Sequence, residues 1–267
     1  MRAGRITLAR VALHGFVGLV LVFLALPNLI VIPISFNPTT VMEFPPRGFT
    51  THWYKRYAQL PGWLDATFVS FLIAVLTAII SLILGTLAAY GLTRGGFRGK
   101  TALRSLLLLP LVVPSLIFAI AIYKLLLALD LVGTIVGFVI AHSVLAIPFV
   151  ITIMSASLRG VDPTLESAAR SLGASRLATL RRITLPLVLP GLLSSALLAF
   201  LVSFDELIVA LFISDPYIST LPKKLWDGIR MEVDPTLAAV STILLAVSFA
   251  VLLLLASLRK ILERRQV

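Results

Sequence analysis

The chain has 267 residues, of which 59% are hydrophobic and 13% are charged. A soluble domain carries about 25% charged residues, so this composition excludes an ordinary soluble domain and favours helices that cross a bilayer. The absence of cysteine excludes disulfides and thiolate metal sites. The net charge of +11 would suit nucleic acid, but the positions of the basic residues indicate membrane topology instead, and we expect no nucleic-acid partner.

Six apolar runs are long enough to span a bilayer as helices. We predict these spans at 11–35, 66–93, 102–128, 132–158, 187–213 and 236–258. The first run follows three arginines, as a signal peptide does, but it is longer than the apolar part of a signal peptide, so we predict a retained anchor. Strands of alternating polarity are not evident. The predicted fold class is therefore an all-α membrane protein with six transmembrane helices.

The loops between these spans divide the basic residues unequally. When the loops are assigned to alternate sides, most of the 23 lysines and arginines fall on the side that holds both termini and residues 159–186. Basic loops remain in the cytoplasm. We therefore predict cytoplasmic termini and contact of the basic loops with anionic lipid.

Between the fourth and fifth spans the sequence reads DPTLESAARSLGASRLATLRRITLP, residues 162–186. Asp162 followed by Pro163 predicts the start of a short helix. Gly173 suits the left-handed position after its end, and Ser175 can cap a second helix. By residue pattern alone, this amphipathic segment either lies on lipid or docks on a protein surface.

The spacing within this segment resembles the cytoplasmic loop of permeases of binding-protein-dependent ABC importers. That pattern is Glu-Ala-Ala, three residues, Gly, nine residues, then Ile-x-Leu-Pro. With Gly173 as the glycine, the other matched positions are Ser167, Ala168, Ala169, Ile183, Leu185 and Pro186. Ser167 occupies the position of the family's glutamate, and Glu166 lies one place earlier. Either Glu166 reaches a partner from there, or the acidic contact is absent.

The resemblance covers about residues 60–258 and implies the type I ABC importer permease fold. It implies an N-terminal helix and external loop in residues 1–60, a permease core of five spans in 61–258, and a basic cytoplasmic tail in 259–267. It also implies coupling to an ATPase through the 162–186 loop, namely through Glu166, Ser167, Ala168, Ala169, Gly173, Ile183, Leu185 and Pro186.

The family resemblance implies a transport subunit of the bacterial inner membrane and not an enzyme. The implied partners are a second permease subunit in a heterodimer, two copies of a cytoplasmic ATPase, a periplasmic or lipid-anchored substrate-binding protein, and membrane lipids. ATP and Mg would bind the ATPase, and the permease itself would bind no cofactor.

A nucleotide site within the chain is not expected. The segment RGGFRGKT, residues 94–101, ends like a phosphate-binding loop, but Arg94 occupies the position of the required first glycine and no strand precedes it. We predict a tight turn there. We also predict no catalytic residue and no metal site, and a structural role for His142 within the fourth span.

The fifth span contains the stretch SFDE, from Ser203 and Phe204 to Asp205 and Glu206. Carboxylates within spans usually face a cavity or a partner, so we predict that these four residues border the substrate pathway. Adjacent side chains on a helix point about 100° apart. One acid can therefore face the pathway while the other bonds a neighbouring helix or the backbone; alternatively, both are hydrated at the outer end of the span.

Aromatic residues are prominent in the two long external loops. Trp53 and Tyr54 lie in the first, and Trp226 lies in a segment of the second, 214–235, that we predict to contain a short helix. These residues either form an interfacial aromatic belt or contact the substrate-binding protein, as the resemblance implies.

SFDE and the later segment TLPKKLWDGIRMEVDPTLAAVST together resemble the spermidine/putrescine branch of these permeases, specifically its second permease subunit. That resemblance implies import of a small cationic solute, a polyamine. The alternatives are an importer of an opine or another small amino compound, and an ion-coupled secondary carrier. The carrier hypothesis gives no role to the spacing of the 162–186 loop.

Overall fold

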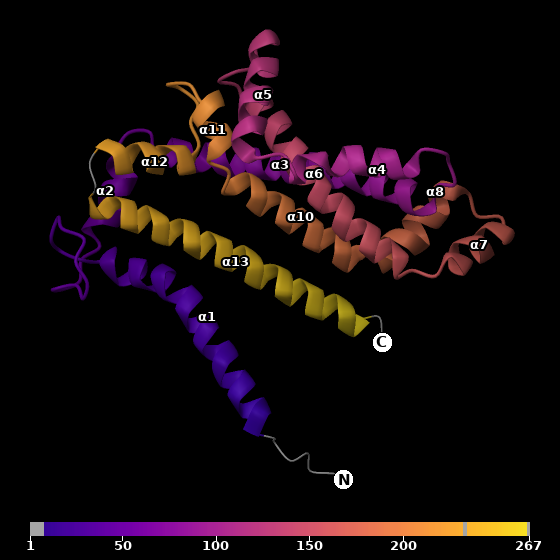
Figure 1. Cartoon of the computed structure of the whole chain (residues 1–267), viewed down its shortest axis with the longest axis horizontal. Coiled ribbons are helices and arrows are strands. Elements are labelled where there is room, and N and C mark those ends of the chain that lie inside the picture. The colour runs from indigo at the N-terminus through magenta and orange to yellow at the C-terminus, as the bar shows by residue number, and fades with distance from the viewer. Residues whose placement is uncertain (1–7, 232–233, 266–267) are drawn as a thin grey trace. The chain divides into compact units, whose positions relative to one another are not determined.

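A computed structural model describes residues 8–231 and 234–265, and regular secondary structure within those ranges is entirely helical (Figure 1). Within those ranges, four helices are long and apolar enough to cross a membrane, and they confirm the first, second, fourth and sixth predicted spans. These are α1 (Leu8–Ile34), α3 (Trp63–Arg94), α6 (Ile135–Arg159) and α13 (Pro235–Arg265).

The third predicted span is not one straight helix. It consists of α4 (Lys100–Leu108), the 3-10 turn η1 (Leu109–Leu111) and α5 (Ser115–Ala128), with a bend of 100°. Pro110 and Pro114 lie at this bend, where the proline ring removes a backbone N–H and clashes with the preceding turn. The prediction of a continuous helix over 102–128 was therefore wrong.

The fifth predicted span is also broken. At its predicted start, a bend of 75° separates α10 (Leu189–Phe204) from the segment Arg176–Leu187, most of which was predicted to belong to the 162–186 loop. That segment comprises α8 (Arg176–Thr179), the π-helical turn η2 (Leu180–Thr184) and α9 (Leu185–Leu187). Beyond α10, a second break precedes α11 (Ile208–Ile213). If each bent pair is one span, the described residues contain up to six spans, as predicted.

Three further helices connect these elements. They are α2 (His52–Gln59), α7 (Pro163–Ser171) and α12 (Leu221–Met231). The last confirms the short helix that the 214–235 pattern predicts. Contacts divide the chain into two compact units, one formed by residues up to Pro61 with Asp227–Val247, the other by Gly62–Trp226 and the residues from Ser248.

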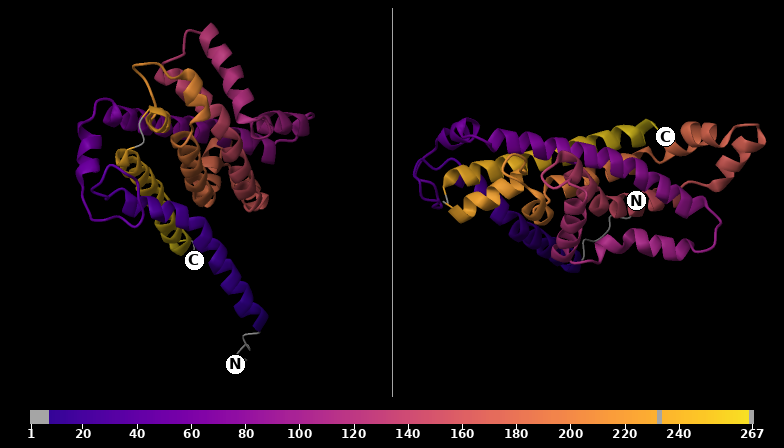
Figure 2. Two further views of the ribbon diagram at one scale, coloured as in Figure 1. Left: turned by 60° about the vertical axis from the view of Figure 1, so that its left-hand side comes forward. Right: turned by 90° about the horizontal axis from the view of Figure 1, so that it is seen from above.

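The core of the second unit is formed by α3, α6 and α10, which pack side by side (Figures 1 and 2). Small residues bring the helices close, as is usual in membrane proteins. Gly85 of α3 lies against Val150 of α6, and Gly191 of α10 lies against Ser157 of α6. These contacts pack α3 and α10 closely against α6.

Replacing Gly85 with alanine is expected to destabilise this core. An added Cβ would lie 2.7 Å from the Cβ and Cγ1 atoms of Val150, and such overpacking costs about 1–3 kcal/mol. Gly91 is a matched control on the same helix, since a Cβ there meets nothing within 4 Å. Thermal unfolding of the purified protein in detergent should show a lower midpoint for Gly85→Ala and no loss for Gly91→Ala. Equal midpoints would contradict a close α3–α6 contact.

Candidate coupling site

Helix α7, the first helix of the 162–186 loop, has the ends that the sequence predicts. The Asp162 carboxylate accepts a hydrogen bond from the Thr164 amide at 2.9 Å, and Pro163 occupies the first turn. Gly173 has φ of +88°. Its N–H donates to the Arg170 carbonyl, and the next N–H in the chain, that of Ala174, donates to the Ala169 carbonyl. This pair of bonds is a Schellman motif, which requires a left-handed residue at Gly173.

The N-cap of α7 is a charged group. The Thr164 hydrogen bonds lower the pKa of the Asp162 carboxyl below its usual range because they favour the ionised form. The cap therefore contributes stability above the unfolded-state pKa, and that contribution is lost as pH falls through the folded-state pKa. At neutral pH the α7 N-terminus is capped by a carboxylate.

The second half of the loop begins as predicted, with the Ser175 hydroxyl accepting a hydrogen bond from the Ala178 amide at 3.2 Å. It then departs from a simple helix, because residues Leu180–Thr184 form the π-helical turn η2. Such turns mark irregular, often functional, positions in helices. Here the turn places the Thr184 hydroxyl against α7.

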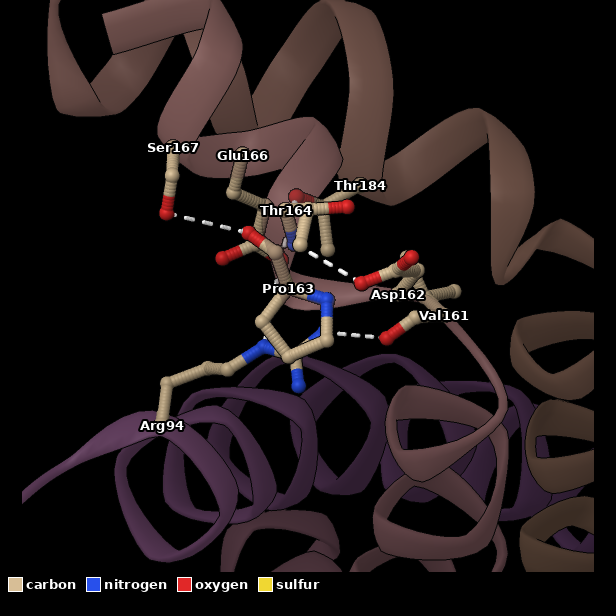
Figure 3. Close-up of polar contacts among 8 residues, drawn as sticks. All are labelled: Arg94, Val161, Asp162, Pro163, Thr164, Glu166, Ser167 and Thr184. Atoms are coloured by element: carbon tan, nitrogen blue, oxygen red, sulfur yellow. Dashed lines mark hydrogen bonds and ion pairs between the residues drawn. The ribbon is translucent and has the colours of Figure 1, made fainter.

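Glu166 points into the protein, where it joins three segments (Figure 3). Arg94, the last residue of α3, donates from Nε to Glu166 Oε1 at 3.2 Å, and the Thr184 hydroxyl donates to the same oxygen at 3.1 Å. Arg94 also donates to the Val161 carbonyl at 2.9 Å. The Arg94 and Glu166 side chains are only 16% and 12% exposed. The Glu166 carboxylate is therefore engaged within this chain.

We call Arg94, Glu166 and Thr184 the α3–α7–η2 clamp. A mostly buried ion pair holds its two partners strongly, since removing one leaves an unpaired charge. A cavity of about 470 Å³ lies beside the clamp and includes Tyr90, Pro163 and Arg170 in its lining. The sequence pattern did not place Arg94 and Thr184 beside Glu166. It identified Arg94 only as the residue at the position of the first glycine of a phosphate-binding loop.

The matched residues of the loop divide into an exposed set and a packed set. Ser167, Ala168 and Gly173 are exposed, and the neighbouring Leu172 is 89% exposed. Ala169, Ile183 and Leu185 are half-buried, whereas Pro186 is exposed. Leu185 packs against the apolar core formed by α3, α6 and α10. The loop therefore presents small and apolar side chains outward from α7 while its second half is anchored to the spans.

The SFDE stretch lies at the second break of the fifth span. Asp205 is exposed, while the Glu206 carboxylate accepts a hydrogen bond from the Val209 amide at 2.9 Å and so caps α11. One acid therefore bonds the backbone and the other is accessible, and a pathway role for Asp205 stays a prediction.

Ser203 and Phe204, the other two residues predicted to border the pathway, are buried within this chain. They are 4% and 3% exposed. The Ser203 hydroxyl lies 2.8 Å from Nδ1 of His142, and the Phe204 ring stacks on Phe200. Both side chains therefore serve helix packing, and His142 has the structural contact that was expected of it.

Trp53, for which an aromatic belt and contact with the binding protein were both considered, is buried in the first unit. It is 3% exposed, and its indole N–H donates to the Asn37 carbonyl at 2.6 Å. The Tyr54 hydroxyl is 2.6 Å from the Ser35 hydroxyl, so this residue is partly engaged within the first unit. Trp226 is half-buried on α12.

Residues 94–101 form a turn between helices. Gly99 has φ of +85° and precedes α4, while α3 ends at Arg94. A helix, and not a strand, thus leads into this turn, unlike a phosphate-binding loop. Across the residues that the structure describes, no group of three or more His, Asp or Glu side chains could hold a metal ion.

Comparisons with known proteins agree with this geometry. Residues 81–267 match the family described as binding-protein-dependent transport system inner membrane component. The spermidine/putrescine transport system permease protein PotC of Escherichia coli (strain K12) is 30% identical, over 92% of this chain and 93% of its own length. The putrescine transport system permease protein PotI of the same organism is 34% identical, over 84% and 82%.

A solved structure shows the same fold. A chain of a bacterial ABC transporter that imports the acidic polysaccharide alginate matches with a TM-score of 0.73 and 16% identity, over 97% of this chain and 98% of that one. The predicted all-α importer permease fold is confirmed. The chain therefore belongs to the family of inner membrane components of binding-protein-dependent transport systems.

Proposed function

We propose that this chain is a permease subunit of an ATP-driven importer of polyamines, spermidine or putrescine. The observation that carries the proposal is the 30% identity to PotC across more than nine-tenths of both chains. The similarity to PotI, a putrescine permease, supports the same class of substrate. An exposed carboxylate also suits a short polycation, because Coulomb attraction does not require a rigid pocket.

The proposed complex contains a second permease subunit, two copies of a cytoplasmic ATPase and a substrate-binding protein outside the membrane. ATP and Mg would reside on the ATPase. The excess of basic residues around the 162–186 loop supports a cytoplasmic location for that loop and for both termini. On the outer side, Tyr54 and Trp226 are the predicted aromatic residues left as candidates for contact with the binding protein.

The exposed side of α7 is the proposed docking element for the ATPase. Leu172, Ala168 and Ser167 give it a small, largely apolar surface that this chain leaves uncovered. An amphipathic helix of this kind fits a groove on a partner. Movement of α7 would reach α3 and the second half of the loop, which leads into α10, through the α3–α7–η2 clamp, because Glu166 bonds Arg94 and Thr184.

Asp205 is the proposed contact for the cationic solute. It is exposed directly after the end of α10, where the helix breaks, so its carboxylate takes no part in the hydrogen bonding of the helix. Glu206 instead supports that site by capping α11. Coulomb attraction between the carboxylate and an ammonium group is about 1–4 kcal/mol at 4 Å for effective dielectric constants between water and a protein surface.

Uptake of labelled spermidine and putrescine by the complete complex in proteoliposomes tests this function. Import should require ATP inside the vesicle, where the ATPase lies, and should exceed import of an opine or an uncharged amino compound. Import by the permease subunits without the ATPase would contradict coupling, and preference for an opine would contradict the substrate class.

Replacing Asp205 with asparagine in the same assay is expected to lower kcat/KM for spermidine about five- to tenfold, in line with loss of one charge contact of about 1 kcal/mol or slightly more. Asp130→Asn is the matched control, because Asp130 is an exposed acid on a connecting loop and asparagine tolerates its φ of +55°. Equal kcat/KM values for Asp205→Asn and wild type would remove Asp205 from the pathway.

A further inference from the structure

A second cavity, of about 290 Å³, lies where the ends of α3 and α6 meet the start of α4. Its lining combines three basic side chains with three hydroxyl groups and one leucine. The residues are Leu92, Thr93, Lys100, Thr101, Arg104, Ser155 and Arg159. None of them belongs to the α3–α7–η2 clamp.

The charge of this cavity is entirely positive. Lys100, Arg104 and Arg159 line it, and no carboxylate does. Lys100 donates to the Gly95 carbonyl at 3.2 Å, which holds its ammonium group in position without neutralising it. Each of the ion pairs described in the structure involves other basic residues. Three cations gathered in one hollow repel one another, and an anion bound among them would relieve that repulsion.

The hydroxyl groups add neutral donors to this positive charge. Ser155 is buried in α6, and Thr93 is half-buried at the end of α3. Arginine forks and hydroxyl groups are the donors that suit the oxygens of a phosphate. A carboxylate of a partner protein would use fewer of these donors.

The cavity lies at the boundary between polar and apolar surface. Arg159 ends the span α6, and Thr93 is one residue from the end of the span α3. Along α4, Leu103 and Leu106 are exposed and lie within two residues of Arg104, which lines the cavity. A phosphate held among the basic residues would therefore leave attached acyl chains beside exposed apolar side chains, as a lipid requires.

From these observations we propose that this cavity binds the phosphate of an anionic phospholipid headgroup. Basic pockets between spans suit such headgroups. The shared chemistry is a phosphate that carries net negative charge, and the exposed leucines of α4 favour lipid over free phosphate as its source. A bound lipid would brace α4 against α6 next to the 162–186 loop.

Native mass spectrometry of the full chain, released from mixed micelles that contain phosphatidylglycerol and phosphatidylcholine, tests the site. We expect retention of phosphatidylglycerol over phosphatidylcholine, and a loss of about fivefold in affinity for each arginine removed, given about 1 kcal/mol per basic residue near a membrane surface. The test variants are Arg104→Gln and Arg159→Gln. Arg98→Gln is the matched control, because Arg98 is exposed on the neighbouring turn and does not line the cavity.

Further measurements distinguish this site from competing explanations. Equal losses in Arg98→Gln and in the two cavity variants would show diffuse attraction and overturn the site. Competition by inorganic phosphate or by tail-free glycerophosphoglycerol at equal concentration would overturn the lipid assignment. A photoactivatable phosphatidylglycerol on the wild-type chain should label 100–104 and 155–159, and labelling elsewhere alone would overturn the proposal even if the variants fail to fold.

Discussion

Replacing Arg94 with methionine is expected to lower ATP-driven uptake at least about tenfold, a larger effect than that of any surface substitution proposed above. The substitution leaves the Glu166 carboxylate mostly buried, with the Thr184 hydroxyl as its remaining described donor. An unpaired charge in such a position costs about 2–3 kcal/mol, between the values for surface and fully buried pairs. We expect α7 to detach from α3. The ratio of solute imported to ATP hydrolysed should then be lower than in the wild type.

The control for this variant is Arg98→Met, which removes an equal charge from the exposed turn that follows α3. The double variant Arg94→Met, Glu166→Gln removes both charges of the clamp. It should recover part of the loss, because no unpaired charge remains, so the two single effects should not add. Normal transport by Arg94→Met would show that the clamp does not transmit motion.

Replacing Gly173 with valine is expected to uncouple ATP hydrolysis from import. Gly173 has φ of +88°, which a β-branched residue adopts only with strain of about 1–2 kcal/mol. A Cβ at this position meets nothing within 4 Å, so the effect tests backbone conformation and not a collision. The strained Schellman motif would open, and the orientation of α7 relative to the second half of the loop would change.

Gly173→Asn is the matched control, because asparagine occupies the left-handed region at lower cost. Reconstituted complexes should show a reduced import-to-hydrolysis ratio for the valine variant and a ratio near wild type for the asparagine variant. Membrane insertion of both should be normal, since residue 173 lies outside the predicted spans. If both variants import at the wild-type rate, the left-handed turn has no part in coupling.

Both variants affect the 162–186 loop, but at different positions. Gly173 sets the angle between the two halves of the 162–186 loop, and Arg94 ties the first half to α3. An ATPase that pushes on the exposed side of α7 would displace the spans only if both the Gly173 turn and the Arg94–Glu166 ion pair were intact. Loss of either is therefore expected to leave hydrolysis running without import.

Features that depend on neighbouring residues could be predicted from the sequence. The Asp162 cap, the Gly173 turn and the Ser175 cap each involve bonds that span only a few residues, so local chemistry decides them. Long apolar runs likewise identified the straight spans, because a bilayer requires length and hydrophobicity of a single helix. Composition and pattern therefore determined the class of protein and the ends of its short helices.

The tertiary structure decided every feature that joins distant parts of the chain. Prolines alone did not show which spans would bend, since α6 continues through Pro148 whereas the chain bends by 100° at Pro110 and Pro114. The direction of Glu166 depends on Arg94, 72 residues away. Trp53 and Ser203 are buried with hydrogen bonds to Asn37 and His142, respectively. The physical reason is that a polar or aromatic side chain turns toward whichever partner folding brings within reach, and a linear pattern does not name that partner.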